Sequence, residues 1–162
     1  MIIKPLSLIF KYLPLKVAYA HCDIPCGIYD PTPMQIAAHT IFRMTRFLKD
    51  IKREDETTAE HTIARITHVK EEHGQRLEEE LGTLENDYFK KEHFEAYPNL
   101  QMLLAESVKL SATTRQHIDL EAAEGLIEKV MQIAEIFYKT KGFEPVRVAS
   151  GYPTEKEIVT HK

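Results

Sequence analysis

The stretch DLEAAEGLIEKVMQIAEIFYKTKG, residues 119–142, has the pattern of one amphipathic helix. Asp119 is a typical residue for capping the start of a helix, and Gly142 is a typical residue at its end. Between them, apolar side chains return every three or four residues and therefore share one face: Leu126, Ile127, Val130, Ile133, Ala134 and Phe137. A helix with one apolar face must bury it against other elements, so we expect this segment to lie within a helical bundle.

The same pattern covers residues 32–52. Thr32 can cap this helix, Pro33 suits its first position, and Gln35 completes a capping box with Thr32. The apolar positions that follow have helical spacing: Ile36, Ile41, Met44, Leu48 and Ile51. We predict a first helix here, with Asp30-Pro31 as the turn that leads into it.

Two more helical segments lie in the middle of the chain. One helix begins at a capping box, Thr57-x-x-Glu60, and we expect it to end or to loosen near Gly82. The next helix begins at Pro98. Their apolar positions are Ile63, Ile66, Val69, Leu77 and Leu81, then Leu100, Leu103, Leu104, Val108 and Leu110. With four such segments and no convincing strand, we predict an all-α fold: an antiparallel four-helix bundle over residues 33–142 and an extended or mobile tail over residues 143–162.

Composition excludes several classes of protein. The chain has 162 residues, 43% of them hydrophobic and 28% charged, which suits one globular domain. No apolar run approaches the roughly 18 residues of a membrane-spanning helix. The net charge of −4 argues against a nucleic-acid binder, which needs a basic face. Removal of residues 1–20, which hold three of the 21 basic residues and no acid, would change it to −7.

Residues 1–20 form a separate leader. They are basic and apolar, contain Pro5 and Pro14, and end in Ala18-Tyr19-Ala20, a small-x-small sequence of the kind after which signal-type peptidases cut. We therefore expect a processing peptidase to cut between Ala20 and His21. Because Lys11 interrupts a short apolar core, we interpret the leader first as a propeptide. We expect a cytoplasmic protein, with export or organelle targeting by the leader as the alternative.

The segment His21-Cys22-Asp23-Ile24-Pro25-Cys26 would become the new N-terminus. It would then offer an α-amine, an imidazole, two thiolates and the Cys22 amide nitrogen to one metal ion. Such donors in a plane suit Ni(II) or Cu(II), whereas Zn(II) prefers a tetrahedron. Pro25 prevents a helix, and Gly27 permits an unusual backbone angle. By itself, a Cys-x3-Cys pair is more often a local disulfide or two buried thiols. We call residues 21–32 the hook.

The hook resembles the N-terminal motif of nickel-containing superoxide dismutases, His-Cys-x-x-Pro-Cys-Gly-x-Tyr, at each of its fixed positions from His21 to Tyr29. A second stretch, DYFKKEHFEAYPNL at residues 87–100, is similar to another characteristic segment of that family. The likeness extends from His21 to about Phe143.

This resemblance implies a function and a set of site residues. His21 would supply the α-amine and an axial imidazole, Cys22 a thiolate and its amide nitrogen, and Cys26 the second thiolate. One nickel ion per subunit would cycle between Ni(II) and Ni(III) and convert superoxide to oxygen and hydrogen peroxide, in antioxidant defence. Asp23 and Tyr29 would shape the pocket that admits superoxide. The family also implies a homohexamer, with no nucleic-acid partner and no membrane association after processing.

The residues around the hook are less well defined by the resemblance. It implies that Tyr88 and Lys90 pack against the hook, with Lys90 as an attractor of the anion or simply a solvated lysine. Some family members brace the axial imidazole with a glutamate and an arginine, but the aligned positions here hold Ala37 and His73. The bracing of His21 is therefore expected to differ in this chain.

Two other classes of function fit a helical bundle. Di-iron carboxylate bundles need Glu-x-x-His pairs on two helices, and no glutamate lies three residues before any of the eight histidines. A structural or partner-binding bundle, with the hook as a chelator or interaction tail, would bind metal without turning over superoxide. Turnover therefore separates that class from an enzyme.

Overall fold

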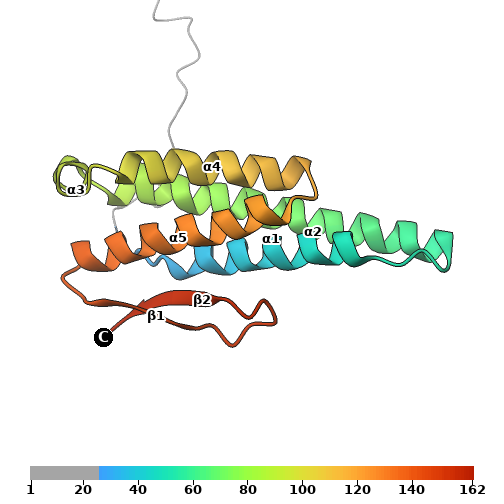
Figure 1. Ribbon diagram of the computed structural model, residues 1–162. Coiled ribbons are helices and arrows are strands. Elements are labelled where there is room, and N and C mark those ends of the chain that lie inside the picture. Colours follow the sequence, from blue (N-terminus) through green and yellow to red (C-terminus); the bar gives the residue numbers. More distant parts are fainter. Residues whose placement is uncertain (1–25) are drawn as a thin grey trace, which may run out of the picture.

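The computed structural model describes residues 26–162 and contains a ring of four long helices (Figure 1). Helix α1 spans Thr32–Asp50 and α2 spans Glu56–Thr83. Helix α4 spans Leu100–Gln116 and α5 spans Leu120–Thr140. The contacting pairs are α1 with α2, α2 with α4, α4 with α5, and α5 with α1, so the predicted four-helix bundle is confirmed. The leader and residues 21–25 of the hook lie outside the described residues.

Helix α5 begins, ends and packs as its sequence predicts. The Asp119 carboxylate accepts the Ala122 N–H at 2.9 Å and so caps the first turn. Gly142 follows the helix with φ of +82°, a left-handed angle that glycine adopts without a Cβ clash. The six predicted inward residues are all buried, none more than 3% exposed. Their burial makes α5 the most apolar element of the core.

The first helix begins differently from the prediction. Thr32 makes no capping bond from its side chain, because Pro31 is the N-cap and the Asp30 carboxylate accepts the Thr32 N–H at 2.6 Å. Gln35 does not complete a capping box; its amide is buried and bonded to the strand that ends the chain. Asp30-Pro31 thus leads into the helix as predicted, but the Gln35 side chain bonds to the C-terminal strand instead of capping the helix.

The N-cap of α2 is Asp55, two residues before the predicted cap Thr57. The Asp55 carboxylate accepts the Thr58 N–H at 3.0 Å. Hydrogen bonds from the Thr58 side chain and from this N–H favour the ionised form and lower the Asp55 pKa. Leu77 and Leu81 are buried as predicted, whereas Ile63 and Ile66 in the outer half are only half-buried. Near Gly82 the helix loosens into a π-helix, η2 (Leu84–Tyr88), and a short helix α3 (Lys91–Ala96) follows.

Two residues predicted to face inward are largely exposed. Ile36 on α1 is 44% exposed and Val108 on α4 is 40% exposed, although both have helical spacing with buried neighbours. Each lies at the margin of the apolar stripe of its helix. At that position a small rotation of the helix about its axis determines whether a side chain faces the core or the solvent.

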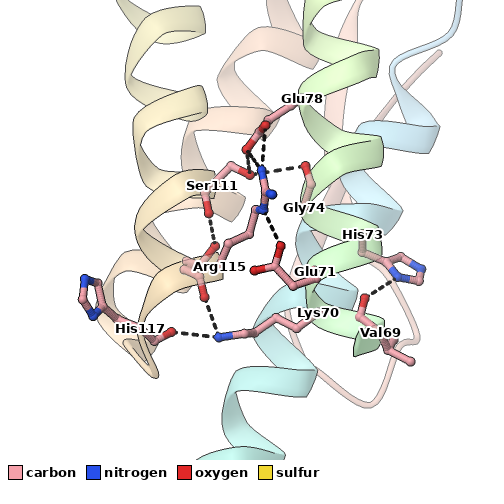
Figure 2. A network of polar contacts seen from close by, with 10 residues as sticks. Val69, Lys70, Glu71, His73, Gly74, Glu78, Ser111, Arg115 and His117 are labelled. Atoms are coloured by element: carbon pink, nitrogen blue, oxygen red, sulfur yellow. Dashed lines mark hydrogen bonds and ion pairs between the residues drawn. The ribbon is translucent and has the colours of Figure 1, made fainter. Parts of the chain in front are cut away.

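A polar network joins α2 to α4 (Figure 2). The Arg115 guanidinium pairs with Glu71 at 2.8 Å and with Glu78 at 3.0 Å, and these partners raise the Arg115 pKa. A Cβ atom at Gly74 would come within 2.5 Å of the Arg115 side chain, so the glycine leaves room for it. The Lys70 ammonium donates to the carbonyls of Thr114 and His117 and satisfies the end of α4. Lys70 is 2% exposed, and burial lowers its pKa.

The tail, predicted to be extended or mobile, forms an antiparallel hairpin. Strand β1 spans Pro145–Ala149 and pairs with β2 (Glu157–His161) in a register that places Arg147 opposite Val159. The hairpin lies along α5 and α1 (Figure 1). Arg147 pairs with Glu128 and Glu135 of α5, which raises the Arg147 pKa and lowers that of Glu128. Because half of its strand residues are exposed and a single one is buried, the hairpin has no strong hydrophobic alternation that sequence reasoning could detect.

Between α1 and the hairpin, the buried His39 ring makes two hydrogen bonds. Nδ1 lies 2.7 Å from the Thr154 hydroxyl and Nε2 lies 3.1 Å from the Glu157 carbonyl oxygen. A carbonyl only accepts, so Nε2 carries the proton and the Thr154 hydroxyl donates to Nδ1. Burial is the main cause that lowers the His39 pKa below 6.5, with a smaller contribution from Lys156 in the same direction.

This pKa predicts how the stability depends on pH. Above the unfolded pKa of about 6.5, His39 is neutral in both states and its contribution to stability is complete. As the pH falls below that value, the unfolded chain takes up the proton first, so stability decreases by at most about 1.4 kcal/mol per pH unit until the folded pKa is reached. Thermal unfolding at pH 7.5 and 5.0, followed by circular dichroism, should show a larger decrease for the parent than for His39→Gln. Equal decreases would contradict this role for His39.

Candidate metal centre

The hook enters the described part of the structure at Cys26, an exposed cysteine. The Ile28 N–H donates to its Sγ at 3.4 Å, a contact that stabilises negative charge on sulfur. Gly27 has φ of +69°, so the predicted unusual backbone angle is present. The other predicted ligands, His21 and Cys22, lie outside the described residues, as does Asp23. Cys26 is thus the single predicted ligand whose surroundings can be described.

No complete metal site exists within residues 26–162. No group of three or more histidine, cysteine, aspartate or glutamate side chains in that range is arranged to hold an ion. A metal bound through Cys26 therefore needs donors from the residues that precede it. His21, Cys22 and the α-amine exposed by cleavage before His21 are chemically suited to complete the set, and a thiolate-rich set of this kind suits nickel or copper.

Tyr29 connects the hook to the bundle. Its ring lies 5.4 Å from that of Tyr88, which is itself 4.6 Å from the Phe137 ring of α5. The His93 ring stacks on Tyr88 at 5.7 Å with 24° between the planes. The aromatic cluster of Tyr29, Tyr88, His93 and Phe137 therefore brings together both segments of the sequence that suggested the family.

The Tyr88 hydroxyl has a defined orientation. It lies 2.7 Å from the Thr140 hydroxyl oxygen, and Thr140 donates its own proton to the Phe137 carbonyl at 2.6 Å. Because the Thr140 proton is already used, Tyr88 donates and Thr140 accepts. Burial raises the Tyr88 pKa, an effect that the hydrogen bond to Thr140 partly offsets. Tyr88 is therefore a neutral phenol at physiological pH, with its proton directed into the bundle.

Two lysines border this cluster. The Lys90 ammonium donates to the Asp87 carbonyl at 2.6 Å, and the Lys90 N–H donates to His93 Nδ1 at 3.1 Å. Lys141 lies over the Tyr88 ring, with Nζ 5.0 Å from its centroid. Sequence reasoning selected Lys90 but missed Lys141, His93 and Thr140. The one feature of the sequence that singles out Lys141 is its position next to Gly142. A lysine there is typical of a helix end and does not indicate a functional site.

Ala37 and His73 lie on the same surface pocket, although they come from different helices. The pocket has a volume of about 320 Å³ and is lined by Pro33, Ile36, Ala37, His73, Arg76, Glu79 and Glu80. His73 Nδ1 lies 2.9 Å from the Val69 carbonyl oxygen and must donate to it, which leaves Nε2 as an acceptor in the neutral ring. Figure 2 shows the His73 ring on the side of α2 away from Arg115.

The described parts of the candidate centre gather at one end of the bundle. Helix α1 begins at the end where α5 finishes and where α3 lies (Figure 1). Cys26, Tyr29, Tyr88 and Lys141 thus come from the hook, η2 and the residue after α5. No helix among the described residues is long and apolar enough to cross a membrane.

Comparisons with known proteins agree with this geometry. The family model for nickel-containing superoxide dismutase matches residues 16–141. The chain is 33% identical over 130 residues to the nickel superoxide dismutase of Streptomyces seoulensis and 31% identical to that of Streptomyces coelicolor, over 80% of this chain and 95% of each relative.

Solved structures give the same result. A native nickel superoxide dismutase aligns with a TM-score of 0.67 at 30% identity, and one with nickel ligation of the oxidised state aligns with 0.68 at 33%. Each alignment covers 75% of this chain and 99% of the other. The chain therefore belongs to the nickel-containing superoxide dismutase family, oxidoreductases with nickel as their cofactor.

Proposed function

We propose that this chain dismutates superoxide at a nickel site that forms at its N-terminus after cleavage between Ala20 and His21. The observation that carries this proposal is the packing of Tyr29 on Tyr88, at 5.4 Å, which joins the hook to the second family segment. In this proposal His21 provides the α-amine and imidazole, Cys22 a thiolate and amide nitrogen, and Cys26 the second thiolate. The bound nickel would supply a one-electron couple between its divalent and trivalent states.

The protein's own residues would guide and confine the substrate. Superoxide is an anion and the processed chain is acidic, so long-range attraction is unfavourable and local positive charge must compensate. Lys141, which lies over the Tyr88 ring, and Lys90, which is bonded to His93 of the aromatic cluster, provide such charge, and both are exposed. Tyr29 and Asp23 would limit the entrance to small species, and the aromatic cluster would keep bulk water from the inner side of the hook.

We also propose a homohexamer in the cytoplasm. Support for assembly comes from large apolar side chains that remain exposed on the helices, including Ile36, Phe47 and Met102 at 40–54%. Light scattering on the processed protein would measure the number of subunits directly, and fractionation of cells would locate it.

The direct test of the function compares two forms of the chain. Protein that begins at His21, loaded anaerobically with nickel, should dismutate superoxide in pulse radiolysis, and the same protein without nickel should not. Protein that begins at Met1 should stay inactive after identical loading, because the peptide bond at residue 20 removes the α-amine as a ligand. If the processed protein binds one nickel per subunit without turnover, the chain is a metal-binding or structural bundle.

Cys26→Ser should abolish nickel-dependent dismutation. A serine hydroxyl does not ionise at neutral pH and is a hard donor, so the nickel couple loses a thiolate. We expect activity to fall to the level of the nickel-free protein, while far-ultraviolet circular dichroism stays unchanged because Cys26 is exposed. Gln116→Ala, at the exposed end of α4, is a control for handling and loading. Full activity of Cys26→Ser would contradict the assignment.

His73 is our candidate for the bracing of the His21 imidazole. Its Nε2 is the unprotonated nitrogen of a ring fixed by Val69, and Ala37 beside it is too small to compete for the same contact. Outer partners of metal-bound histidines typically change affinity or activity about 10- to 100-fold. His73→Phe should therefore lower turnover by about that factor and shift the electron paramagnetic resonance spectrum of oxidised nickel. His68→Phe, at an exposed position on the same helix, should change neither; identical behaviour of the two variants would exclude bracing by His73.

A further inference from the structure

The C-terminal hairpin lies outside the part of the chain that matches the family. The family match ends at residue 141, and the solved structures are covered over 99% of their own length but only 75% of this chain. Residues 143–162 are therefore an addition relative to those structures. Their contacts with α1 lie close to where the hook enters the bundle.

One glutamine joins β2 to the first turns of α1. The Val159 N–H donates to Gln35 Oε1 at 2.7 Å, and Gln35 Nε2 donates to the Val159 carbonyl at 3.0 Å. Both residues are buried, at 2% and 1% exposure. Val159 directs its backbone groups away from β1, so the Gln35 amide occupies the place of a third strand.

A second contact reaches the residues just before Gln35. The His161 ring, at the end of β2, lies 4.8 Å from the Tyr138 ring of α5 and stacks on Phe143 at 4.3 Å. Tyr138 is buried beside Thr32 and Asp30: burial and the Asp30 charge raise its pKa, and a hydrogen bond with Thr32 acts in the opposite direction. The hairpin and the end of α5 thus enclose the start of α1.

The start of α1 needs this support. The first N–H groups of a helix have no partner within it, and here the cap consists of Asp30 bonded to the Thr32 N–H without a side-chain bond from the N-cap residue. Only four residues separate Cys26 from Pro31, so any motion of the first turn is transmitted to the hook. A metal-binding segment that leaves the domain at a rigid position loses less conformational freedom when it binds the metal.

We propose that the hairpin anchors the root of the hook, by which we mean residues 30–35, where the hook joins the first turn of α1. Gln35 is the positioning residue through which β2 acts on the metal site. This inference rests on the proposed function, because it assigns the hook as the place where nickel binds. The hook is thus held at two points. Tyr29 packs on Tyr88 of η2, and Gln35, at the start of α1, bonds to Val159 of β2.

The test uses the full processed chain, His21 to Lys162, with Gln35→Leu. Loss of two buried hydrogen bonds should accelerate amide hydrogen exchange at residues 30–36 by about tenfold or more in the nickel-free protein. Release of nickel to excess chelator should accelerate by a similar factor, about tenfold. Thr45→Val is the matched control, since Thr45 is equally buried on α1 but bonds only to Ile41 of its own helix.

Gln35→Glu keeps the test decisive if the leucine variant does not fold. A protonated carboxyl reproduces both bonds to Val159, whereas the carboxylate faces the Val159 carbonyl with a negative charge. Protection of residues 30–36 in Gln35→Glu should therefore match the parent at low pH and be lost as the pH rises. Unchanged exchange in both variants would overturn the proposal. Hydrogen exchange is measured on the nickel-free protein, so it tests the anchoring role of the hairpin independently of activity. Absence of dismutation in the parent would instead refute the proposed function.

Discussion

The apolar face of α5 is the contact on which the rest of the structure depends. Its buried residues pack on α1 and α4, and its charged outer side holds the hairpin through Glu128 and Glu135. The same helix delivers Phe137, Tyr138 and Thr140 to the end of the bundle where the hook enters. Because one helix supplies core, hairpin and site contacts, a change in its rotation would displace all three together.

The candidate site illustrates how a short ligand segment can gain a fixed position. The described part of the hook, residues 26–32, is held where it touches the folded domain. Tyr29 contacts an aromatic cluster whose central phenol is fixed by Thr140. The root of the hook contacts buried groups of α5 and β2. The described part of the hook and the residues that follow it are thus supported by three elements far apart in the sequence.

Electrostatics at this end of the bundle differ from those of the whole chain. The protein carries a net negative charge, yet Lys141 lies over the Tyr88 ring and the Lys90 N–H donates to His93 of the same aromatic cluster. A local cation matters more to an incoming anion than distant carboxylates, because solvent ions screen charges beyond roughly 10 Å. The arrangement is consistent with an anionic substrate at a site on an otherwise acidic surface.

Four features could be predicted from the residues alone: the four helices, the buried face of α5, the glycine that ends it and the two segments typical of the family. These depend on local spacing and on residue types that act within a few positions of each other. Three other features emerged from the folded chain: Gln35 bonds to β2 rather than forming a capping box, Lys141 lies over Tyr88, and residues 143–162 form a hairpin. Each of these depends on contacts across tens of residues, where burial and hydrogen-bond satisfaction override local preference.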